Sequence, residues 1–378
     1  MSNNNDKKIL NVPALRFPEF TGEWKKMRLG DNCNIQMCKR IMAAQTNTEG
    51  GVPFYKIGTI GGKADAYISK DLFDEYKMKY SFPHKGEVMI TCAGTVGKCI
   101  IYNGEDSYYQ DSNIVWIDNP NEIISNDFLY HLLSKINWSH LNSTTIVRIY
   151  NDDLRNLKLY YPHHDEQKKI THLFQLINER IATQNKIIED LKKLKSAIRK
   201  MIFTSLKNEH TENREINQLL AYEQPSEYIV TNDEYSADTT LTPVLTANKG
   251  FVLGYTNENF GIYKKGECII FDDFTMDAKY VSFPFKVKSS AIKILTAKPN
   301  VNLRFMFEYL SYLELKSEEH KRHYISEIAS LIIELPSKEK QNRIAYLMTS
   351  LDNKLALEEN TMARYMDEKQ YILLQMFI

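Results

Sequence analysis

The stretch YPHHDEQKKI at residues 161–170 decides the fold, because a related stretch, LPSKEKQNRI, follows at residues 335–344. The two align at an offset of 174 residues, and the alignment continues without a gap to the end of the chain. Identical residues at this offset are Leu157/Leu331, Pro162/Pro336, Gln167/Gln341, Ile170/Ile344, Leu173/Leu347, Ala182/Ala356, Lys195/Lys369, Ile198/Ile372 and Phe203/Phe377. A weaker repeat, KGEVMI at 85–90 against KGECII at 265–270, lies upstream. The chain therefore contains one arrangement twice, a variable segment followed by a repeated one.

Both repeated segments have the pattern of a long helix. Each begins near a proline, which a first helical turn tolerates, and neither contains Gly or Pro afterwards. Apolar residues recur every three or four positions over about 40 residues, or roughly 60 Å of helix. A period of 3.5 residues sustained over five heptads indicates a coiled coil, although two amphipathic helices on separate cores would be the plainer alternative. The predicted seam is Ile170, Leu173, Ile177, Ile187, Leu191, Leu194, Ile198, Ile344, Leu347, Leu351, Leu355, Met362, Tyr365 and Ile372, with Arg180, Gln184, Glu358 and Lys369 as polar seam positions.

The variable segments have the pattern of short strands with few helices. Strands are expected at 86–92, 99–102 and 113–118, followed by a helix at 126–133. The second segment repeats this order, with strands at 242–247, 251–255, 266–271 and 280–287 and a helix at 302–313. The polar stretch NEHTENRE at 208–215 is the best candidate for a linker. The fold class is therefore α+β, with two β-rich domains separated by two long helices.

Composition excludes several classes of protein. The 378 residues carry 48 basic and 48 acidic side chains, and no run of 18 apolar residues or secretory signal is present. Five cysteines without a CxxC pair suggest reduced thiols and a cytoplasmic location. Residues 162–207 hold 10 basic and 5 acidic residues, whereas residues 208–335 hold 13 and 19. A protein that coats DNA without specificity would be basic throughout, so any DNA-binding surface is local.

Enzyme motifs are incomplete. Gly94-Thr95-Val96-Gly97-Lys98 resembles part of a phosphate loop, but Cys92 and Cys99 stand where the motif needs Gly and Ser or Thr. No GxGxxG is present, and Asp118-Asn119-Pro120 lacks the second proline and the aromatic residue of an adenine methyltransferase pocket. His163-His164 has no metal-ligand spacing. Asp272-Asp273 would be paired carboxylates without a base or nucleophile nearby.

The order of several motifs resembles one family. VPALRFPEF at 12–20 with EW at 23–24 and RLGD at 28–31 is similar to the start of the specificity subunit of type I restriction–modification systems. The repeated helix entries at Pro162 and Pro336 resemble the same family, although KEKQ at 338–341 departs from its commoner acidic pair before Gln. TPVLT at 242–246, GYTNE at 254–258 and IFDDFT at 270–275 are similar to one version of its second target-recognition domain.

The resemblance implies a subunit without catalytic activity of its own. Residues 1–161 and 208–335 would be target-recognition domains that read the two halves of a split sequence in double-stranded DNA. Residues 162–207 and 336–378 would pair as an antiparallel coiled-coil spacer and hold two methyltransferase subunits. The complex would methylate adenine at N6 with S-adenosylmethionine and, with motor–nuclease subunits, cleave DNA using ATP and magnesium. This chain would bind none of these cofactors and no metal.

The physical requirements agree with that implication. Half-sites read in successive major grooves lie roughly 34–36 Å apart, which a stiff rod of roughly 60 Å can span. Base and phosphate contacts need cationic, amide and hydroxyl side chains on rigid loops. In the first domain the candidates are Lys39, Arg40, Lys56, Lys63, Thr95, Lys98, Gln110, Asn113 and Arg148. In the second they are Lys249, Tyr255, Thr275, Lys279, Lys286, Lys288 and Arg322.

Two alternatives differ in class. A coiled-coil adaptor that does not bind DNA would show no sequence-selective DNA binding even with its partners present. A self-sufficient methyltransferase or nuclease would need the cofactor motifs that are incomplete here.

Overall fold

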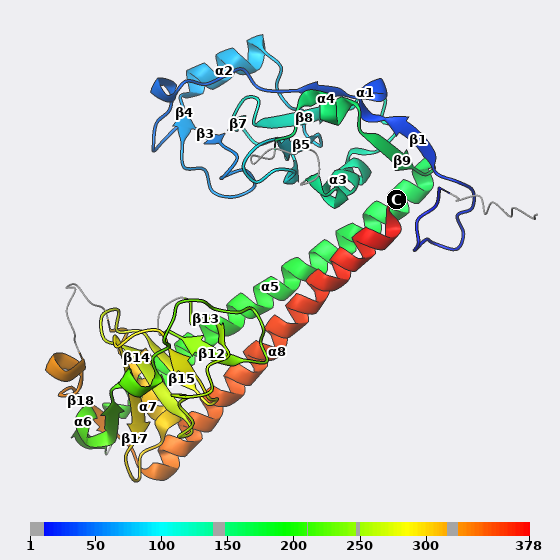
Figure 1. Cartoon of the computed structure of the whole chain (residues 1–378). Coiled ribbons are helices and arrows are strands. Elements are labelled where there is room, and N and C mark those ends of the chain that lie inside the picture. Colours follow the sequence, from blue (N-terminus) through cyan, green and yellow to red (C-terminus); the bar gives the residue numbers. More distant parts are fainter. Residues whose placement is uncertain (1–10, 139–147, 210, 247–249, 316–323) are drawn as a thin grey trace, which may run out of the picture. The chain divides into compact units, whose positions relative to one another are not determined.

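The computed structural model of the chain describes residues 11–138, 148–209, 211–246, 250–315 and 324–378. It contains two compact units, Met1–Thr183 with Met362–Ile378 (unit 1) and Gln184–Thr361 (unit 2). The two long helices, α5 (His164–Leu206) and α8 (Lys338–Met376), belong to both (Figure 1). Each unit therefore contains the first part of one long helix and the last part of the other. No helix in the described ranges is both long enough and apolar enough to cross a membrane.

Unit 1 is built on two small sheets and one separate antiparallel pair of strands. A four-stranded sheet has the order β2-β8-β5-β6, a three-stranded sheet has the order β4-β3-β7, and β1 pairs with β9. The strands are β1 (Lys25–Arg28), β2 (Asn34–Gln36), β3 (Val52–Tyr55), β4 (Tyr67–Ile68), β5 (Val88–Thr91), β6 (Cys99–Ile101), β7 (Tyr108–Tyr109), β8 (Ile114–Asp118) and β9 (Lys158–Tyr161). The helices are α1 (Leu29–Asn32), η1 (Ala43–Gln45), α2 (Lys70–Lys79), α3 (Asn126–Lys135) and α4 (Asn151–Arg155).

Unit 2 repeats this topology. Its sheets have the orders β11-β17-β14-β15 and β13-β12-β16, and β10 pairs with β18. The strands are β10 (Glu212–Glu215), β11 (Leu220–Glu223), β12 (Thr242–Leu245), β13 (Val252–Thr256), β14 (Cys268–Asp272), β15 (Ala278–Val281), β16 (Lys286–Val287), β17 (Ile292–Ala297) and β18 (Ile332–Leu335). The helices are α6 (Ile216–Leu219), η3 (Pro225–Tyr228), α7 (Leu303–Tyr312) and the π-helical turn η4 (Tyr324–Ile328). Even the parallel pairing recurs, between β3 and β7 and between β12 and β16.

The predicted order of strands and helices is confirmed, with two local corrections. The expected strand at 280–287 is divided, because β15 ends at Val281 and β16 begins at Lys286. The expected linker at 208–215 is partly wrong, because Glu212–Glu215 forms β10 and pairs with β18. Polar composition did not reveal this strand, since its side chains are mostly exposed and only its backbone pairs.

Each four-stranded sheet has a core on both faces. In unit 1, Val88, Ile90, Val115 and Ile117 pack with α3 on one face, while residues such as Met89 and Trp116 face the three-stranded sheet. This alternation follows the two-residue period of a strand. The long helices complete the α3 side, since Phe174 from α5 and Phe377 from α8 join that core. In Figure 1 the red end of α8 lies beside the first turns of α5.

The long helices pair antiparallel within each unit. In unit 1 the Arg180 Nε donates to the Tyr365 hydroxyl at 3.0 Å. In unit 2 the Gln184 amide donates to the Glu358 carbonyl at 3.1 Å, and Lys195 pairs with Asp352. As the α5 partner advances along the chain, the α8 partner moves back, which confirms the antiparallel coiled coil. Gln184 and Glu358 are two of the four polar seam positions that the sequence predicted.

The residue-level phase of the seam on α5 needs a correction. Ile187 and Leu194 are 40% and 49% exposed, whereas Ile188 is 8% exposed and Phe174 is fully buried. On α8 the same shift occurs once, because Leu347 is 41% exposed and Met348 is fully buried. Ile170, Ile344 and Met362 are buried, and the other predicted seam residues are half-buried: Leu173, Ile177, Leu191, Ile198, Leu351, Leu355, Tyr365 and Ile372. The phase was ambiguous because Leu173-Phe174 and Ile187-Ile188 are adjacent apolar pairs, which fit a 3-4 or a 4-3 spacing equally well.

The repeated glutamines attach each long helix to the short helix of its unit. The buried Gln167 accepts a hydrogen bond from the Ser125 backbone N–H at 2.8 Å and donates to the Pro162 carbonyl at 3.1 Å. Gln341 does the same for the Asn302 N–H at 2.9 Å and the Pro336 carbonyl at 2.9 Å. Ser125 and Asn302 are the N-caps of α3 and α7. The identical Pro and Gln of the repeat therefore have a structural role at the start of both helices.

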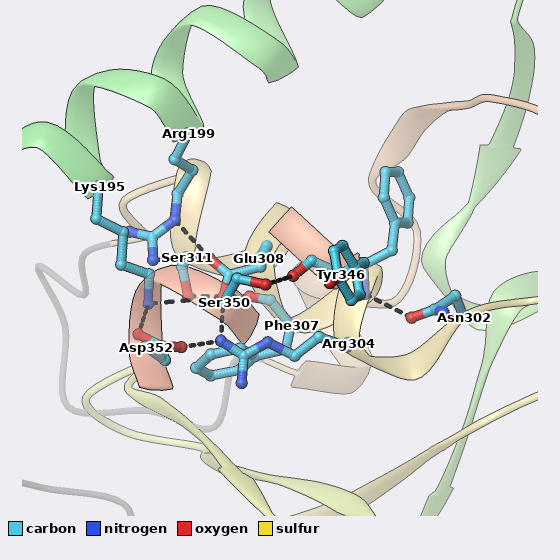
Figure 2. Close-up of polar contacts among 11 residues, drawn as sticks. Lys195, Arg199, Asn302, Arg304, Phe307, Glu308, Ser311, Tyr346, Ser350 and Asp352 are labelled. Atoms are coloured by element: carbon cyan, nitrogen blue, oxygen red, sulfur yellow. Dashed lines mark hydrogen bonds and ion pairs between the residues drawn. The ribbon is translucent and has the colours of Figure 1, made fainter. Parts of the chain in front are cut away.

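A buried ion network ties α7 to both long helices in unit 2 (Figure 2). Glu308 of α7 is fully buried and lies 2.8 Å from Arg199, 3.7 Å from Lys195 and 2.5 Å from Arg304. Asp352 of α8 pairs with Lys195 and Arg304. Three cations thus face two carboxylates, so every charge has a partner of opposite sign.

Candidate nucleic-acid interface

Three loops of unit 1 meet at one end of its sheets, and we call residues 56–63, 92–98 and 110–113 with Arg40 and Arg148 the loop face. The Lys98 ammonium donates to the Ile60 carbonyl at 2.6 Å, which joins the first two loops. The Ile57 N–H donates to the Gln110 side chain at 3.4 Å, and the Cys92 N–H donates to the Asn113 carbonyl at 2.7 Å. The loops are therefore held together by direct hydrogen bonds.

The two arginines are fixed at the edge of this loop face. Arg40 pairs with Asp111 at 2.8 Å and remains mostly exposed. Arg148 donates to the Ser112 carbonyl at 3.2 Å and stacks over the exposed Tyr150 ring at 5.9 Å. Ser112 has a positive φ of 53°, which turns its carbonyl toward Arg148. Sequence reasoning missed Asp111, Ser112 and Tyr150, and only their position beside the predicted Gln110, Asn113 and Arg148 pointed to them.

The structure brings together all the predicted residues of the first domain except Lys39. Lys56, Lys63, Thr95, Lys98, Gln110 and Asn113 come from the three loops, and all are exposed or half-buried. Lys56 also pairs with Asp65 at 3.1 Å. Lys39 lies over the Tyr80 ring instead, with its ammonium 5.3 Å from the ring centre. The gathered side chains offer cations, amides and a hydroxyl, which are the groups that bind phosphates and base edges.

The Gly-Lys pair of the loop face is not a phosphate loop. Gly97 has a φ of +82°, and a Cβ there would lie 2.0 Å from the Trp138 ring. The loop leads into strand β6 rather than into a helix, so it lacks the helix N-terminus that a phosphate loop uses. Burial raises the pKa of the neighbouring Cys92 thiol to about 12, against a smaller opposing effect of Arg148. Cys92 is therefore a protonated core residue and not a nucleophile.

Unit 2 has an equivalent set of loops with other side chains. In unit 2 the Lys288 N–H donates to the Leu245 carbonyl at 3.1 Å. The equivalent bond in unit 1 runs from the Gln110 N–H to the Tyr55 carbonyl at 2.9 Å. The Asp273 N–H donates to the Ala291 carbonyl at 2.9 Å, as the Cys92 N–H does to Asn113. These bonds place Lys288 at the position of Gln110. Exposed Thr275, Ser289 and Ser290 lie in the same loops.

The predicted residues of the second domain are only partly gathered there. Thr275 and Lys288 lie in the equivalent loops, Lys279 lies half-buried on β15, and Tyr255 lies half-buried on β13. Lys249 and Arg322 fall outside the described residues. Thr275 is oriented by Asp272, whose carboxylate accepts the Phe274 and Thr275 N–H groups at 2.9 Å.

Lys286 is a wrong prediction. Its side chain is fully buried, pairs with Glu258 at 2.8 Å and donates to the Phe260 carbonyl at 2.9 Å. Burial opposes ionisation of Glu258, yet hydrogen bonds from Lys286 and Thr231 hold its pKa low, at about 2. The apparent surface lysine is thus an internal ion pair, which charge alone could not distinguish from an exposed one.

Asp273 is also internal. It is buried, lies 3.4 Å from the buried Lys293, and accepts the Tyr324 N–H at 2.8 Å. Within the described ranges, no three His, Cys, Asp or Glu side chains gather as a metal site would require. The arrangement can present hydrogen-bond donors and acceptors to a ligand.

Two stretches of the chain, residues 21–193 and 207–364, match the family described as type I restriction modification DNA specificity domain. The chain belongs to this specificity family. The two matches correspond to the two copies of the repeat, each with one loop-bearing domain. Within the specificity family, a type I restriction enzyme specificity subunit of Haemophilus influenzae is 46% identical over 164 residues, 43% of this chain and 40% of that protein.

A second curated relative and a solved structure are also similar to this chain. The EcoR124I/EcoR124II specificity subunit of Escherichia coli is 39% identical over 167 residues, 41% of each chain. The chain therefore covers about two-fifths of the length of these two curated relatives. The specificity subunit structure from M. genitalium is 14% identical, with a TM-score of 0.58 over 97% of this chain and 99% of that one, which shows the shared fold.

Proposed function

We propose that this chain is the DNA-reading subunit of a type I restriction–modification complex, and that its two units read two different halves of one split target. The observation that carries the proposal is the pair of equivalent loop sets. Their backbone hydrogen bonds recur, while Gln110 in one set is replaced by Lys288 in the other. A shared scaffold with unlike side chains suits two readers with different sequence preferences.

Direct base contacts would come from the amides and arginines of the loop face. Asn and Gln side chains pair with adenine and Arg with guanine in the major groove, with about 1–3 kcal/mol of discrimination per good pair. We assign Gln110, Asn113, Arg40 and Arg148 to this role. Lys56, Lys63 and Lys98 would contact phosphates, which set position but not sequence.

The second unit would read its half-site with fewer charges. Lys288, Thr275 and the adjacent serines are the exposed polar groups of its loops. Its predicted domain, residues 208–335, has six more acidic than basic residues, 19 against 13. Most of that surface must avoid DNA, so contacts in this unit would be concentrated on the loops.

The long helices would act as the spacer and as the docking site for partners. α5 and α8 continue from one unit to the other without a break, so their length would fix the number of base pairs between half-sites. Two methyltransferase subunits would bind this chain, and motor–nuclease subunits would complete the assembly. Adenine methylation with S-adenosylmethionine and cleavage with ATP and magnesium would then be reactions of the partners. The boundaries at 161/162, 207/208 and 335/336 remain our proposed division of the chain.

The test is DNA binding by the complex of this chain with its methyltransferase. Lys98→Ala should weaken binding to all sequences and reduce the salt slope by about 1, as expected for one phosphate contact. Arg148→Ala should cost about 1–3 kcal/mol on the specific target and relax the preference at one base pair. Lys79→Ala removes an exposed α2 cation outside both the loop face and the long helices and is the matched control. Unchanged affinity and salt dependence for both loop-face variants would refute the interface.

A further inference from the structure

The two units can be compared residue by residue along their short helices. Gln167 binds the N-cap of α3 at Ser125, and Gln341 binds the N-cap of α7 at Asn302. The second residue after each cap is then Asp127 in unit 1 and Arg304 in unit 2. The sixth is His131 and Glu308 respectively. Eleven residues after each glutamine, α5 has Asn178 and α8 has Asp352. These three pairs of positions are structurally equivalent.

In unit 2 an arginine of the chain itself fills this location (Figure 2). Arg304 pairs with Glu308 at 2.5 Å and with Asp352. Its guanidinium also lies 5.1 Å from the Tyr280 ring centre and 5.0 Å from that of Phe307, and these two rings are 5.8 Å apart, so a pair of neighbouring aromatic rings packs against it. Carboxylates at the edge and aromatic rings on the faces are the surroundings that a guanidinium prefers.

In unit 1 the same location is an open pocket. It has a volume of about 270 Å³ and is lined by Asp127, Tyr130, His131, Gln175, Asn178 and Glu179, among others. Asp127 stands where unit 2 has its arginine, so the internal cation is replaced by a carboxylate. Tyr130 stands at the position of Phe307, and Glu179 adds a second carboxylate from α5. The two carboxylates that hold Arg304 in unit 2 are thus replaced by the neutral His131 and Asn178. Asp127 and Glu179 supply two other carboxylates and Tyr130 an aromatic face, which are groups that bind a guanidinium.

His131 places a hydrogen-bonding group at the wall of this pocket. It is 6% exposed, and no described residue forms a hydrogen bond with its ring nitrogens. Its ring stacks on Phe174 with centres 4.3 Å apart. Burial, and then the nearby Lys369, lower its pKa to about 4, so it is neutral at neutral pH. A neutral imidazole at the pocket wall, with no hydrogen-bond partner among the described residues, can accept a hydrogen bond from a donor that enters.

We infer that this pocket of unit 1 is a socket for an arginine side chain of a protein partner. Resting on the proposed function, that partner is a methyltransferase subunit. The incoming guanidinium donates to Asp127 and Glu179, and its plane stacks on Tyr130. DNA is excluded as the occupant, because two carboxylates repel phosphate. Lysine fits less well than arginine, since it lacks the planar group that stacks and donates in two directions.

The inference makes the two ends of the chain unequal. Unit 2 fills its own socket with Arg304, so only unit 1 takes an arginine from outside. Two copies of one methyltransferase subunit would therefore be held with different affinities. The chain also supplies the variant that closes the socket, because Asp127→Arg copies the residue of unit 2, and Asn178→Asp copies its partner carboxylate.

The experiment titrates the full chain with the methyltransferase subunit and measures bound copies by mass photometry. The wild type should bind two copies, and the Asp127→Arg/Asn178→Asp variant should lose affinity for one of them by about 30-fold or more, the cost of losing a buried charge pair. Asp71→Arg makes the same charge change on the exposed start of α2 and is the control. Equal affinities for wild type and the closed-socket variant would overturn the inference.

A small-molecule probe tests whether the pocket binds a guanidinium, whichever protein supplies it. N-acetyl-arginine amide is added to the wild-type chain and to the closed-socket variant, and the His131 ring signal is followed by NMR. A saturable shift in the wild type alone, with a weaker response to N-acetyl-lysine amide, supports the socket. No shift in the wild type overturns it. A shift without any methyltransferase binding by the wild type keeps the socket and refutes the proposed function.

Discussion

The buried carboxylate of Glu308 should be one of the most stabilising side chains in unit 2, and Glu308→Leu tests this. Glu308 is fully buried among Lys195, Arg199 and Arg304, and Asp352 is the second carboxylate of the network. The variant leaves three cations facing one carboxylate. Removing one partner of a buried ion pair costs about 3–5 kcal/mol. The cations keep 15–19% of their side-chain surface exposed, so water can partly rehydrate them, and we expect about 3 kcal/mol, the lower end of that range.

Hydrogen exchange measured by mass spectrometry localises the effect. A loss of about 3 kcal/mol corresponds to roughly a hundredfold faster exchange in peptides of α7. Peptides of α3 serve as the internal reference, and the three tryptophans, Trp24, Trp116 and Trp138, report on unit 1 alone. Glu339→Leu, which breaks an exposed α8 pair with Arg343, should leave exchange unchanged. A Glu308→Leu variant as well protected as this control would refute the argument.

Three further predictions follow from the helices. Ile188→Ala should lower the unfolding free energy by about 2–4 kcal/mol and Ile187→Ala by much less, since only Ile188 is buried. Urea unfolding measures both, and equal losses would return Ile187 to the seam. Gln167→Ala and Gln341→Ala should each cost about 1–3 kcal/mol by leaving a buried N–H and a carbonyl unpaired, measurable by thermal unfolding, and an unchanged Tm would contradict the capping role. Because the folded pKa of His131 is about 4 and the unfolded value is near 6.5, the unfolded chain binds the extra proton between these values. Stability should therefore be complete above about pH 6.5 and fall by about 3 kcal/mol toward pH 4, and His131→Phe should flatten that slope; an equal slope in the variant would assign the pH dependence to other groups.

The repeat predicted the two long helices and the division of the chain into two similar halves. Local patterns predicted strands such as β5, β8 and β14 and the helices α3 and α7, because periods of 3.6 and 2 residues are visible without a structure. The helix α2 and the central strand β17 were not predicted. The repeat also indicates which residues of α5 belong to the seam. The apolar positions chosen on α8, Leu355, Met362 and Ile372, map at this offset onto Ile181, Ile188 and Ile198 of α5, and Ile188 is the residue that is buried. Requiring one phase for both copies would have corrected Ile187.

The site was less accessible to sequence reasoning, for a physical reason. The loops that contain Ile57, Cys92 and Gln110 come together through long-range hydrogen bonds, which no local pattern encodes. Several candidates chosen by charge in the first domain, such as Lys98 and Arg148, do lie in neighbouring loops. The same rule was wrong for Lys286, because its buried partner Glu258 lies 28 residues away along the chain. Sequence analysis did not identify the proposed arginine pocket of unit 1, since that proposal depends on comparing the structural positions of Asp127 and Arg304.

The most direct measurement of the central claim is a genome-wide map of modified adenines in cells that co-express this chain with its methyltransferase. Our account predicts one asymmetric motif in two specified parts, separated by a constant number of unspecified base pairs. Inserting two heptads into α5 and α8 should change that number, or abolish modification, without changing either part. A continuous motif, or modification that does not depend on this chain, would contradict the account.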